Sequence, residues 1–438
     1  MTAEPLSLRA AARSIAEERL SATAVTEACL RHIAASDARI EAWAFLDPDH
    51  ARRQAAEADR SQRDGRPLGP LHGVPMAIKD VFDTADMPTE YGSPIHAGHQ
   101  PARDAWPVAR LRAAGAVILG KTVTTEFAWY RPGKTRNPHD PARTPGGSSS
   151  GSAAAVGAGM VPGALGTQTN GSVIRPAAFC GVVGYKPTHG LIARTGTLML
   201  SRTLDHVGVF ARSVEDAALL AETLAGDDAD DPDTRPAAHP PLLATALTEP
   251  PRRPRLAFVR TAVWDQAEAT TRAAFESLAA RLAAPAVELP SSFGAALDLH
   301  RTVADVEIAH YLAREYAMAP SLLSEHLRTL IERGHATPGP AYLATCAEVA
   351  ALGRSLDALF EGYDAILTPA AAGEAPLGLA ATGSPAFCTL WTLLGVPAIS
   401  LPLLKGPAGM PLGVQLVGRH GEDARLLRTA RWLASVPS

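Results

Sequence analysis

Two serines stand in small-residue segments that are well suited to carry out chemistry. Ser148 lies in the run Gly146-Gly147-Ser148-Ser149-Ser150-Gly151, and Ser172 ends the run Thr169-Asn170-Gly171-Ser172. An apolar stretch of helical character separates the two runs, so the serines meet only if the chain folds back on itself. A serine hydroxyl is a weak nucleophile until a neighbouring group removes its proton. The pair therefore predicts a nucleophile and a proton relay, with a base elsewhere in the chain.

Histidine, the usual base for a serine nucleophile, has no companion motif here. The chain contains 14 histidines but no Gly-x-Ser-x-Gly elbow. His72, His139 and His206 each lie in a turn-like context, where a capping or solvated role is expected. The sequence therefore indicates no Ser-His-Asp arrangement.

Lys79 is the remaining candidate base, at the end of an apolar strand predicted for residues 74–78. A free lysine has a pKa of about 10.4 and is almost fully protonated at neutral pH. Burial disfavours the charged form and lowers that pKa, which would free the amine to accept a proton. The alternative is that Lys79 pairs with Asp80 or Asp83 at the strand end. The two serine runs favour the base.

Backbone N–H groups accompany both serines. The turn over residues 169–172 offers consecutive N–H groups that form a plausible oxyanion hole. The first run leads into a predicted helix start near Ala153, whose N–H groups favour developing negative charge. Glycine and serine also build flexible linkers, but this run is not repeated and enters a helix directly.

Arg175 lies three residues beyond Ser172. Its guanidinium is able to clamp a substrate carboxylate through parallel hydrogen bonds. It is equally able to pair with an acidic side chain of the protein, and the sequence leaves both interpretations open.

The segment from Gly115 to Thr122 matches the Walker A pattern by letter. Its four middle residues are Ala, Val, Ile and Leu, which favour a strand rather than a loop that wraps phosphate. We therefore do not expect nucleotide binding there.

Strands and helices alternate along the segments that must position these residues. Apolar runs at 116–119 and 182–183 are predicted strands, whereas residues 152–160 are predicted to be helical. This alternation favours an α/β fold in which a sheet is covered by helices.

The whole chain, 1–438, is expected to form one domain, because late strands usually complete a sheet begun earlier. We divide it into N-terminal helices (1–65), a core that holds both serines (66–225), an exposed loop rich in Asp, Pro and Ala (226–256), a mostly helical insertion (257–362), and strands with a final helix (363–438). Strands are predicted at 256–259, 365–367, 398–401 and 414–417.

Composition places the chain among globular proteins and offers no electrostatic case for some partners. Hydrophobic residues make up 46% and charged residues 20% of the sequence, and the formal net charge is −4. That balance favours neither nucleic acid nor an anionic membrane surface. The four cysteines have no C-x-x-C spacing and the start lacks a signal-peptide pattern, so we expect free thiols and a cytoplasmic protein.

The same residues resemble the signature of the amidase signature family of serine hydrolases. The likeness runs from the segment 73–80 through both serine runs and 176–188 to Asp205, residues 213–216 and the late segment 395–402. It implies a mixed β-sheet sandwiched between helices and a Ser-cisSer-Lys catalytic set, with no metal or cofactor. By position, Ser172 would be the nucleophile, Ser148 the bridging serine after a cis peptide, and Lys79 the base.

The resemblance also implies the finer roles. The N–H groups of Thr169, Asn170, Gly171 and Ser172 would form the oxyanion hole, and water would hydrolyse an acyl-Ser172 intermediate. Many relatives carry Asp and Gly where this chain has Gln168 and Asn170, and Arg175 comes one residue later than in the common Ser-x-Arg pattern. That later arginine resembles the malonamidase branch, in which an arginine holds the substrate's free carboxylate.

The expected activity is hydrolysis of a small, carboxylate-bearing amide, with release of ammonia or an amine. Two alternatives stay open within this chemistry: a hydrolase of carboxylated ureas of the carboxybiuret type, and an A-type component of an amidotransferase, which needs partner subunits. A catalytically silent scaffold is a third interpretation. We expect a small-molecule amide as partner, no nucleic acid and no membrane, with a homodimer possible.

Overall fold

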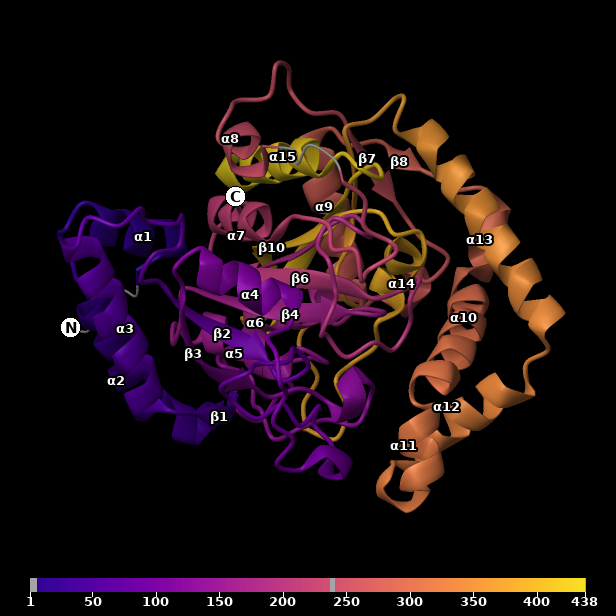
Figure 1. The fold of residues 1–438 in the computed structure, drawn as a ribbon. Helices are drawn as coiled ribbons and strands as arrows, with labels where there is room; N and C mark the ends of the chain where they lie inside the picture. The colour runs from indigo at the N-terminus through magenta and orange to yellow at the C-terminus, as the bar shows by residue number, and fades with distance from the viewer. Residues whose placement is uncertain (1–5, 237–240, 438) are drawn as a thin grey trace.

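The computed structural model describes residues 6–236 and 241–437. Its centre is one mixed sheet of eleven strands in the order β1-β3-β2-β4-β6-β5-β10-β11-β9-β7-β8 (Figure 1). Strands from both halves of the sequence join in this sheet, because β5 pairs with β10 in antiparallel register. The α/β fold with helices on a mixed sheet is therefore confirmed.

The strands are β1 (Trp43–Leu46), β2 (Pro75–Lys79), β3 (Val117–Thr122), β4 (Gly163–Gln168), β5 (Val183–Lys186), β6 (His206–Ala211), β7 (Leu256–Val259), β8 (Ala286–Val287), β9 (Ala365–Pro369), β10 (Ala398–Lys405) and β11 (Pro411–Val417). The first helices are α1 (Leu8–Ala16), α2 (Ala22–Ile40), α3 (Pro48–Arg63), α4 (Trp106–Ala113), α5 (Ser150–Gly157), α6 (Ile174–Cys180), α7 (Val214–Leu224) and α8 (Leu242–Ala246). The later ones are α9 (Ala269–Leu282), α10 (Ala296–Tyr311), α11 (Ala313–Met318), α12 (Glu325–Ala336), α13 (Gly339–Leu359), α14 (Ala386–Leu393) and α15 (Asp423–Ser435).

Strand β2 lies between two parallel neighbours, β3 and β4, with Ile78 opposite both Lys121 and Leu165. The carboxyl ends of these three strands therefore meet at one edge of the sheet. Such an edge is where open α/β sheets bind ligands. Lys79 ends β2, and the turn that carries Ser172 follows β4 directly.

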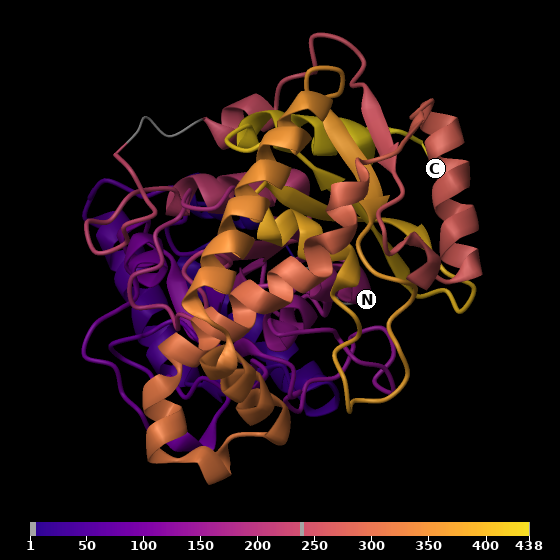
Figure 2. The ribbon, with the colours of Figure 1, turned by 90° about the vertical axis from the view of Figure 1, so that its right-hand side faces the viewer.

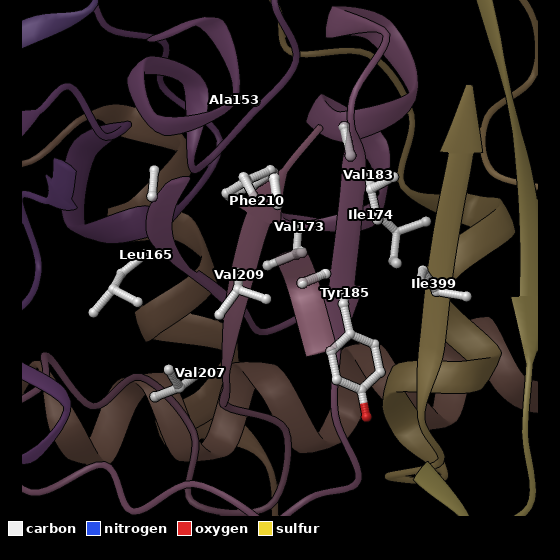
Figure 3. Packing of buried hydrophobic residues seen from close by; sticks show 14 of the residues in the cluster. Ala153, Leu165, Val173, Ile174, Val183, Tyr185, Val207, Val209, Phe210 and Ile399 are labelled. Carbon is white, nitrogen blue, oxygen red and sulfur yellow. The ribbon is translucent and has the colours of Figure 1, made fainter. Parts of the chain in front are cut away.

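Helix α6 packs closely on the sheet because the strands beneath it carry glycine at the contacts. A Cβ atom at Gly184 of β5 would lie 2.4 Å from the Cβ of Ala177, and one at Gly413 of β11 would lie 2.4 Å from the Cβ of Ala178. Around it Figure 3 shows side chains of carbon, with the Tyr185 hydroxyl as the polar exception; Val173 and Ile174 lie beside the strand residues Val183, Val209 and Tyr185.

Late helices extend the molecule on one side. Helices α10 to α13 form a group in which α10 packs against α12 and α13, seen in orange at the right of Figure 1 and in front in Figure 2. Helix α10 also packs against α14, which precedes the late strand β10. These contacts bring residues from beyond position 296 close to the early strands.

Several sequence-based boundaries were wrong. Residues 1–65, expected to be helical, include the strand β1, and strands β4, β6 and β8 were not predicted. Strand β4 reads Gly-Ala-Leu-Gly-Thr-Gln, which lacks the β-branched pattern typical of a strand. The strand predicted at 256–259 is β7, which pairs with β9 in the central sheet, and the rest of the stretch to 362 is mostly helical, as predicted.

The stretch 226–256, predicted to be an exposed loop, is partly buried. Asp231 is 4% exposed because it forms an ion pair of 2.8 Å with the buried Arg194, and α8 lies in the same stretch. Residues 237–240 of that stretch lie outside the described residues. Among the described helices, none is long and apolar enough to cross a membrane. All four cysteines are free, as predicted.

Candidate active site

Lys79 is fully buried at the carboxyl end of β2 and contacts two hydroxyls. Its Nζ lies 2.7 Å from Ser148 Oγ and 2.7 Å from Thr167 Oγ1. Burial lowers the pKa of Lys79 well below its usual value of 10.5, and attraction to the Asp205 carboxylate opposes this shift only in part. The site therefore favours a neutral amine within reach of a serine hydroxyl.

The alternative partners of Lys79 have other contacts. Asp80 forms an ion pair of 3.2 Å with Lys121, and Asp83 accepts a hydrogen bond of 2.6 Å from the Tyr91 hydroxyl. The interpretation of Lys79 as a strand-end ion pair is therefore wrong. Lys121 belongs to the Walker-like segment, and it is buried in strand β3 rather than in a phosphate-binding loop, as the sequence predicted.

Ser148 lies in the turn before α5, and several side chains hold this turn on the sheet. The peptide bond from Gly147 to Ser148 is cis. Ser149 Oγ donates to the carbonyl of Thr167 at 3.2 Å, and Ser152 Oγ donates to that of Leu165 at 2.7 Å. Both acceptors belong to β4, so the serine run is anchored to the strand that leads to Ser172.

Ser172 lies between β4 and α6 in a turn that Gln168 caps. The Gln168 Oε1 accepts hydrogen bonds from the N–H groups of Val173 at 2.8 Å and Ile174 at 3.0 Å. The N–H groups of residues 169–172 have no hydrogen-bond acceptor among the residues that the structure describes. Four free N–H groups next to a serine suit the stabilisation of an oxyanion.

Ser148 and Ser172 line one small pocket together with Asn170, Arg175 and Tyr130. The lining is completed by Ala128, Trp129, Thr382 and Pro385. The two serines of separate turns therefore face a common space, with Lys79 behind Ser148.

Arg175 brings a buried guanidinium to this pocket. It is 3% exposed, and its Nη2 donates to the carbonyl of Gly147 at 2.7 Å and to Thr382 Oγ1 at 3.1 Å. Among the described residues, its Nε and Nη1 have no hydrogen-bond partner, and no carboxylate forms an ion pair with it. Burial lowers the pKa of Arg175. The alternative that Arg175 pairs with an acidic side chain is therefore wrong.

Asn170 forms part of the pocket wall, and its side-chain amide is held in place. Its Oδ1 accepts a hydrogen bond of 2.7 Å from the Thr389 hydroxyl of α14, while its Nδ2 lies 3.5 Å from the Tyr130 hydroxyl. The amide is thus fixed between an early loop and a late helix.

Several contact residues escaped the sequence reasoning. Thr167 stands beside Lys79 in the unpredicted strand β4, and no motif marks Thr382, His300 or Thr392, which lie far along the chain from the serines. Only Thr167 had a signal, its position in the run Gly-Thr-Gln-Thr before Asn170.

The three histidines considered as bases lie elsewhere. Each has a ring nitrogen bonded to a backbone carbonyl: His72 to Ala58, His139 to Cys180 and His206 to Leu204. His206 is also 3% exposed, so of the two roles expected for it the solvated one is wrong, whereas its bond to the carbonyl of Leu204 fits the capping one. No group of three or more His, Cys, Asp or Glu side chains suited to a metal ion occurs among residues 6–236 and 241–437.

Comparison with known proteins gives a consistent result. A family profile described as Amidase matches residues 24–427. The chain is 37% identical over 479 aligned positions to the A-type component of the glutamyl-tRNA(Gln) amidotransferase of Anaeromyxobacter sp. (strain K), covering 98% of this chain and 95% of that protein.

Two solved structures are similar over nearly their full length. One comes from a study of a vestigial protein complex and the origins of an s-triazine catabolic enzyme, with a TM-score of 0.91, 30% identity and 98% of both chains covered. The other is the native peptide amidase from Stenotrophomonas maltophilia, with a TM-score of 0.85, 33% identity, and 98% of this chain and 96% of that chain covered.

Proposed function

This chain belongs to the amidase family of amide-hydrolysing enzymes, and from that premise we propose that it cleaves a small amide that also carries a carboxylate. The observation that carries the proposal is the buried Arg175 guanidinium, which has two nitrogens without a partner among the described residues and lines the same pocket as Ser172. A buried cation without a counter-ion is costly, and a substrate carboxylate would supply the missing charge.

In the proposed mechanism, Ser172 Oγ attacks the amide carbonyl carbon. Its proton passes to Ser148 Oγ while the Ser148 proton passes to the neutral amine of Lys79, 2.7 Å away. The carbonyl oxygen becomes an oxyanion facing the free N–H groups of residues 169–172. Attraction to the Asp205 carboxylate stabilises the ammonium that Lys79 becomes.

Collapse of this intermediate breaks the C–N bond. The leaving nitrogen takes the proton back from Lys79 through Ser148 and departs as ammonia or an amine, leaving an ester on Ser172. Water then attacks the ester carbonyl and passes one proton along the same path. Breaking the Ser172–acyl bond restores the serine hydroxyl and releases a carboxylic acid.

The test compares malonamate with malonamide, which has a second neutral amide in place of the carboxylate. Arg175→Met is expected to raise KM for malonamate roughly 10- to 100-fold, because hydrogen bonds between charged groups contribute about 1.5–3 kcal/mol. KM for malonamide should change little. Equal effects on both amides would show that Arg175 has a structural role only.

Two controls accompany this test. Ser172→Ala is expected to abolish turnover of every amide, and full activity in that variant would contradict the proposed nucleophile. Because Arg175 also holds the carbonyl of Gly147, labelling of Ser172 by a fluorophosphonate should be measured in Arg175→Met to show that the serines remain in place.

The second candidate is the A-type component of an amidotransferase, favoured by the 37% identity to proteins of that kind. It predicts glutaminase activity that appears only with a partner protein, so co-purification followed by a glutaminase assay distinguishes the two. Hydrolysis of malonamate by the isolated chain supports the first candidate. A carboxylated urea would place its carboxylate on the same Arg175 guanidinium, so its hydrolysis should be measured beside that of malonamate.

A further inference from the structure

The carbonyl groups of the turn before Ser172 are held by two side chains that come from late helices. His300 of α10 has its Nε2 3.0 Å from the carbonyl oxygen of Thr169. Thr392 of α14 donates its hydroxyl to the carbonyl oxygen of Asn170. Neither contact belongs to the proposed catalytic set.

The direction of each of these hydrogen bonds follows from its partners. A carbonyl oxygen only accepts, so His300 Nε2 must carry the proton, and burial lowers the pKa of His300 to about 4 and keeps the ring neutral. Gln168 Oε1 accepts from two backbone N–H groups, so its Nε2 is free to donate to Thr392 Oγ1 at 2.9 Å. The Thr392 hydroxyl has two carbonyl acceptors within reach, that of Asn170 and, at 3.1 Å, that of Cys388 one turn earlier in α14. The contact with Asn170 is the shorter one, and donation along it makes a directed chain from Gln168 to the turn.

Peptide geometry converts these contacts into an orientation of N–H groups. In a planar trans peptide unit, the C=O and N–H bonds point in opposite directions. Holding the Thr169 carbonyl toward α10 therefore directs the N–H of Asn170 away from α10. Holding the Asn170 carbonyl toward α14 directs the N–H of Gly171 away from α14 in the same manner.

We propose that His300 and Thr392 are positioning residues that fix the two peptide planes of the oxyanion hole, so that the N–H groups of Asn170 and Gly171 face the substrate carbonyl. This inference rests on the proposed function, since it takes Ser172 as the nucleophile. Without these anchors, either peptide is free to rotate and turn its carbonyl toward the developing negative charge. Transition-state stabilisation would fall, whereas binding of the ground state would change little.

Packing of α14 against the turn supports the same role. A Cβ atom added at Gly171 would lie 3.0 Å from the Cβ of Pro385 and 3.3 Å from the Cβ of Cys388. Glycine thus lets α14 approach closely enough for Thr392 to reach the Asn170 carbonyl.

The experiment measures how fast an ethoxy fluorophosphonate labels Ser172 in the full-length protein, followed by mass spectrometry. Ser172 displaces fluoride, and the phosphoryl oxygen occupies the oxyanion hole, so this rate reports the hole without knowledge of the natural amide. Thr392→Val, which removes the hydroxyl but keeps the shape, is expected to slow labelling roughly 10- to 100-fold. Thr392→Ser, which keeps the hydroxyl, should label at close to the wild-type rate.

Thr389→Val is the matched control one turn earlier on α14. Thr389 holds the side chain of Asn170 rather than its peptide plane, so labelling should change less than about threefold. His300→Gln keeps an N–H donor and should retain more activity than His300→Phe. With malonamate, the loss in Thr392→Val should appear in kcat and leave KM nearly unchanged.

The outcomes separate the two proposals. If wild-type Ser172 is not labelled, or Ser172→Ala still hydrolyses malonamate, the proposed function fails. If Ser172 is labelled but Thr392→Val reacts as fast as Thr392→Ser, only the positioning role is overturned. Should His300→Phe fail to fold, the Thr392 pair, checked by thermal melting, decides the question.

Discussion

Lys79 and Lys121 lie at the carboxyl ends of the neighbouring parallel strands β2 and β3, and both are fully buried. Lys121 has a carboxylate partner, Asp80, at 3.2 Å, whereas the Lys79 amine is hydrogen-bonded to the hydroxyls of Ser148 and Thr167. Burial lowers the pKa of both lysines, but Asp80 opposes the shift at Lys121 through an ion pair and a hydrogen bond. The same residue type in adjacent strands is therefore an ion-pair partner in one place and a candidate base in the other.

The difference indicates what makes a buried lysine reactive. An amine surrounded by hydroxyls is more stable neutral, and it then has a lone pair for proton transfer. An amine beside a carboxylate is favoured in its charged form, and removing either partner leaves an uncompensated buried charge. Substitutions at the two lysines separate these two effects.

Replacing Lys79 by Met should remove the base and leave the fold intact. We expect kcat for malonamate to fall roughly 10²- to 10⁴-fold, the usual contribution of a general base. The urea midpoint should stay the same or rise, because a buried amine without a carboxylate partner is removed. Substantial turnover in this variant would assign the proton to another group.

Replacing Lys121 by Met should have the opposite effect: the protein should lose stability and keep its activity. It leaves the Asp80 carboxylate buried without its cation, and breaking such a pair costs about 3–5 kcal/mol of the free energy of unfolding. Turnover per folded molecule should remain near wild type. Asp80→Asn in the same chain should restore part of the lost stability in a urea titration, and a further loss would show that the pair is not the cause.

The pH profile of kcat/KM tests the neutral amine. Only the deprotonated Lys79 accepts a proton, so activity should rise with pH through the pKa of Lys79 and level off above it. Burial places that rise well below the ordinary lysine value of 10.5, although attraction to Asp205 opposes the shift in part. Lys121→Met should leave the rise where it is, and a rise centred near the ordinary lysine value would contradict a desolvated base.

The smallest effect is expected at Thr167, the second hydroxyl at Lys79 Nζ. Thr167→Val removes one hydrogen bond of about 1 kcal/mol, so kcat should fall by up to about tenfold. Thr167→Ser keeps the hydroxyl and serves as the matched control in the same assay. Equal rates for Val and Ser would show that Ser148 alone orients the amine.

The sequence predicted the parts of the site that depend on local pattern. The strand before Lys79, the two serine turns and the apolar strand of the Walker-like segment all follow from neighbours in the chain. The different partners of Lys79 and Lys121 could not be predicted in this way. They depend on which side chains the register of β2, β3 and β4 brings together. Strand β4 itself was missed because it carries glycine where other parts of the fold lie close. A Cβ atom at Gly166 would be 2.6 Å from Cε2 of Phe210 and 2.8 Å from Oγ of Ser149.

The residues around the turn were beyond prediction for a related reason. The sequence did not decide whether Arg175 binds a substrate carboxylate or pairs with an acidic side chain. One of its hydrogen-bond partners, Thr382, lies 207 positions away in the chain. No sequence motif marks His300 or Thr392, and their contacts with the turn arise only from the packing of α10 and α14. Contacts of this range are fixed by the tertiary fold and leave no local pattern.

Thr389 and Thr392 reach Asn170 across 219 and 222 positions of the chain. During synthesis, both serines are therefore translated long before α14, the helix that holds the turn at residues 169–172. A polypeptide cut short before α14 would carry every member of the proposed Ser-Ser-Lys set but would lack these contacts to the turn, and also the strands β10 and β11 of the central sheet. We expect truncated products of this gene to be inert rather than unregulated hydrolases, so the order of synthesis itself delays reactivity until the molecule is complete.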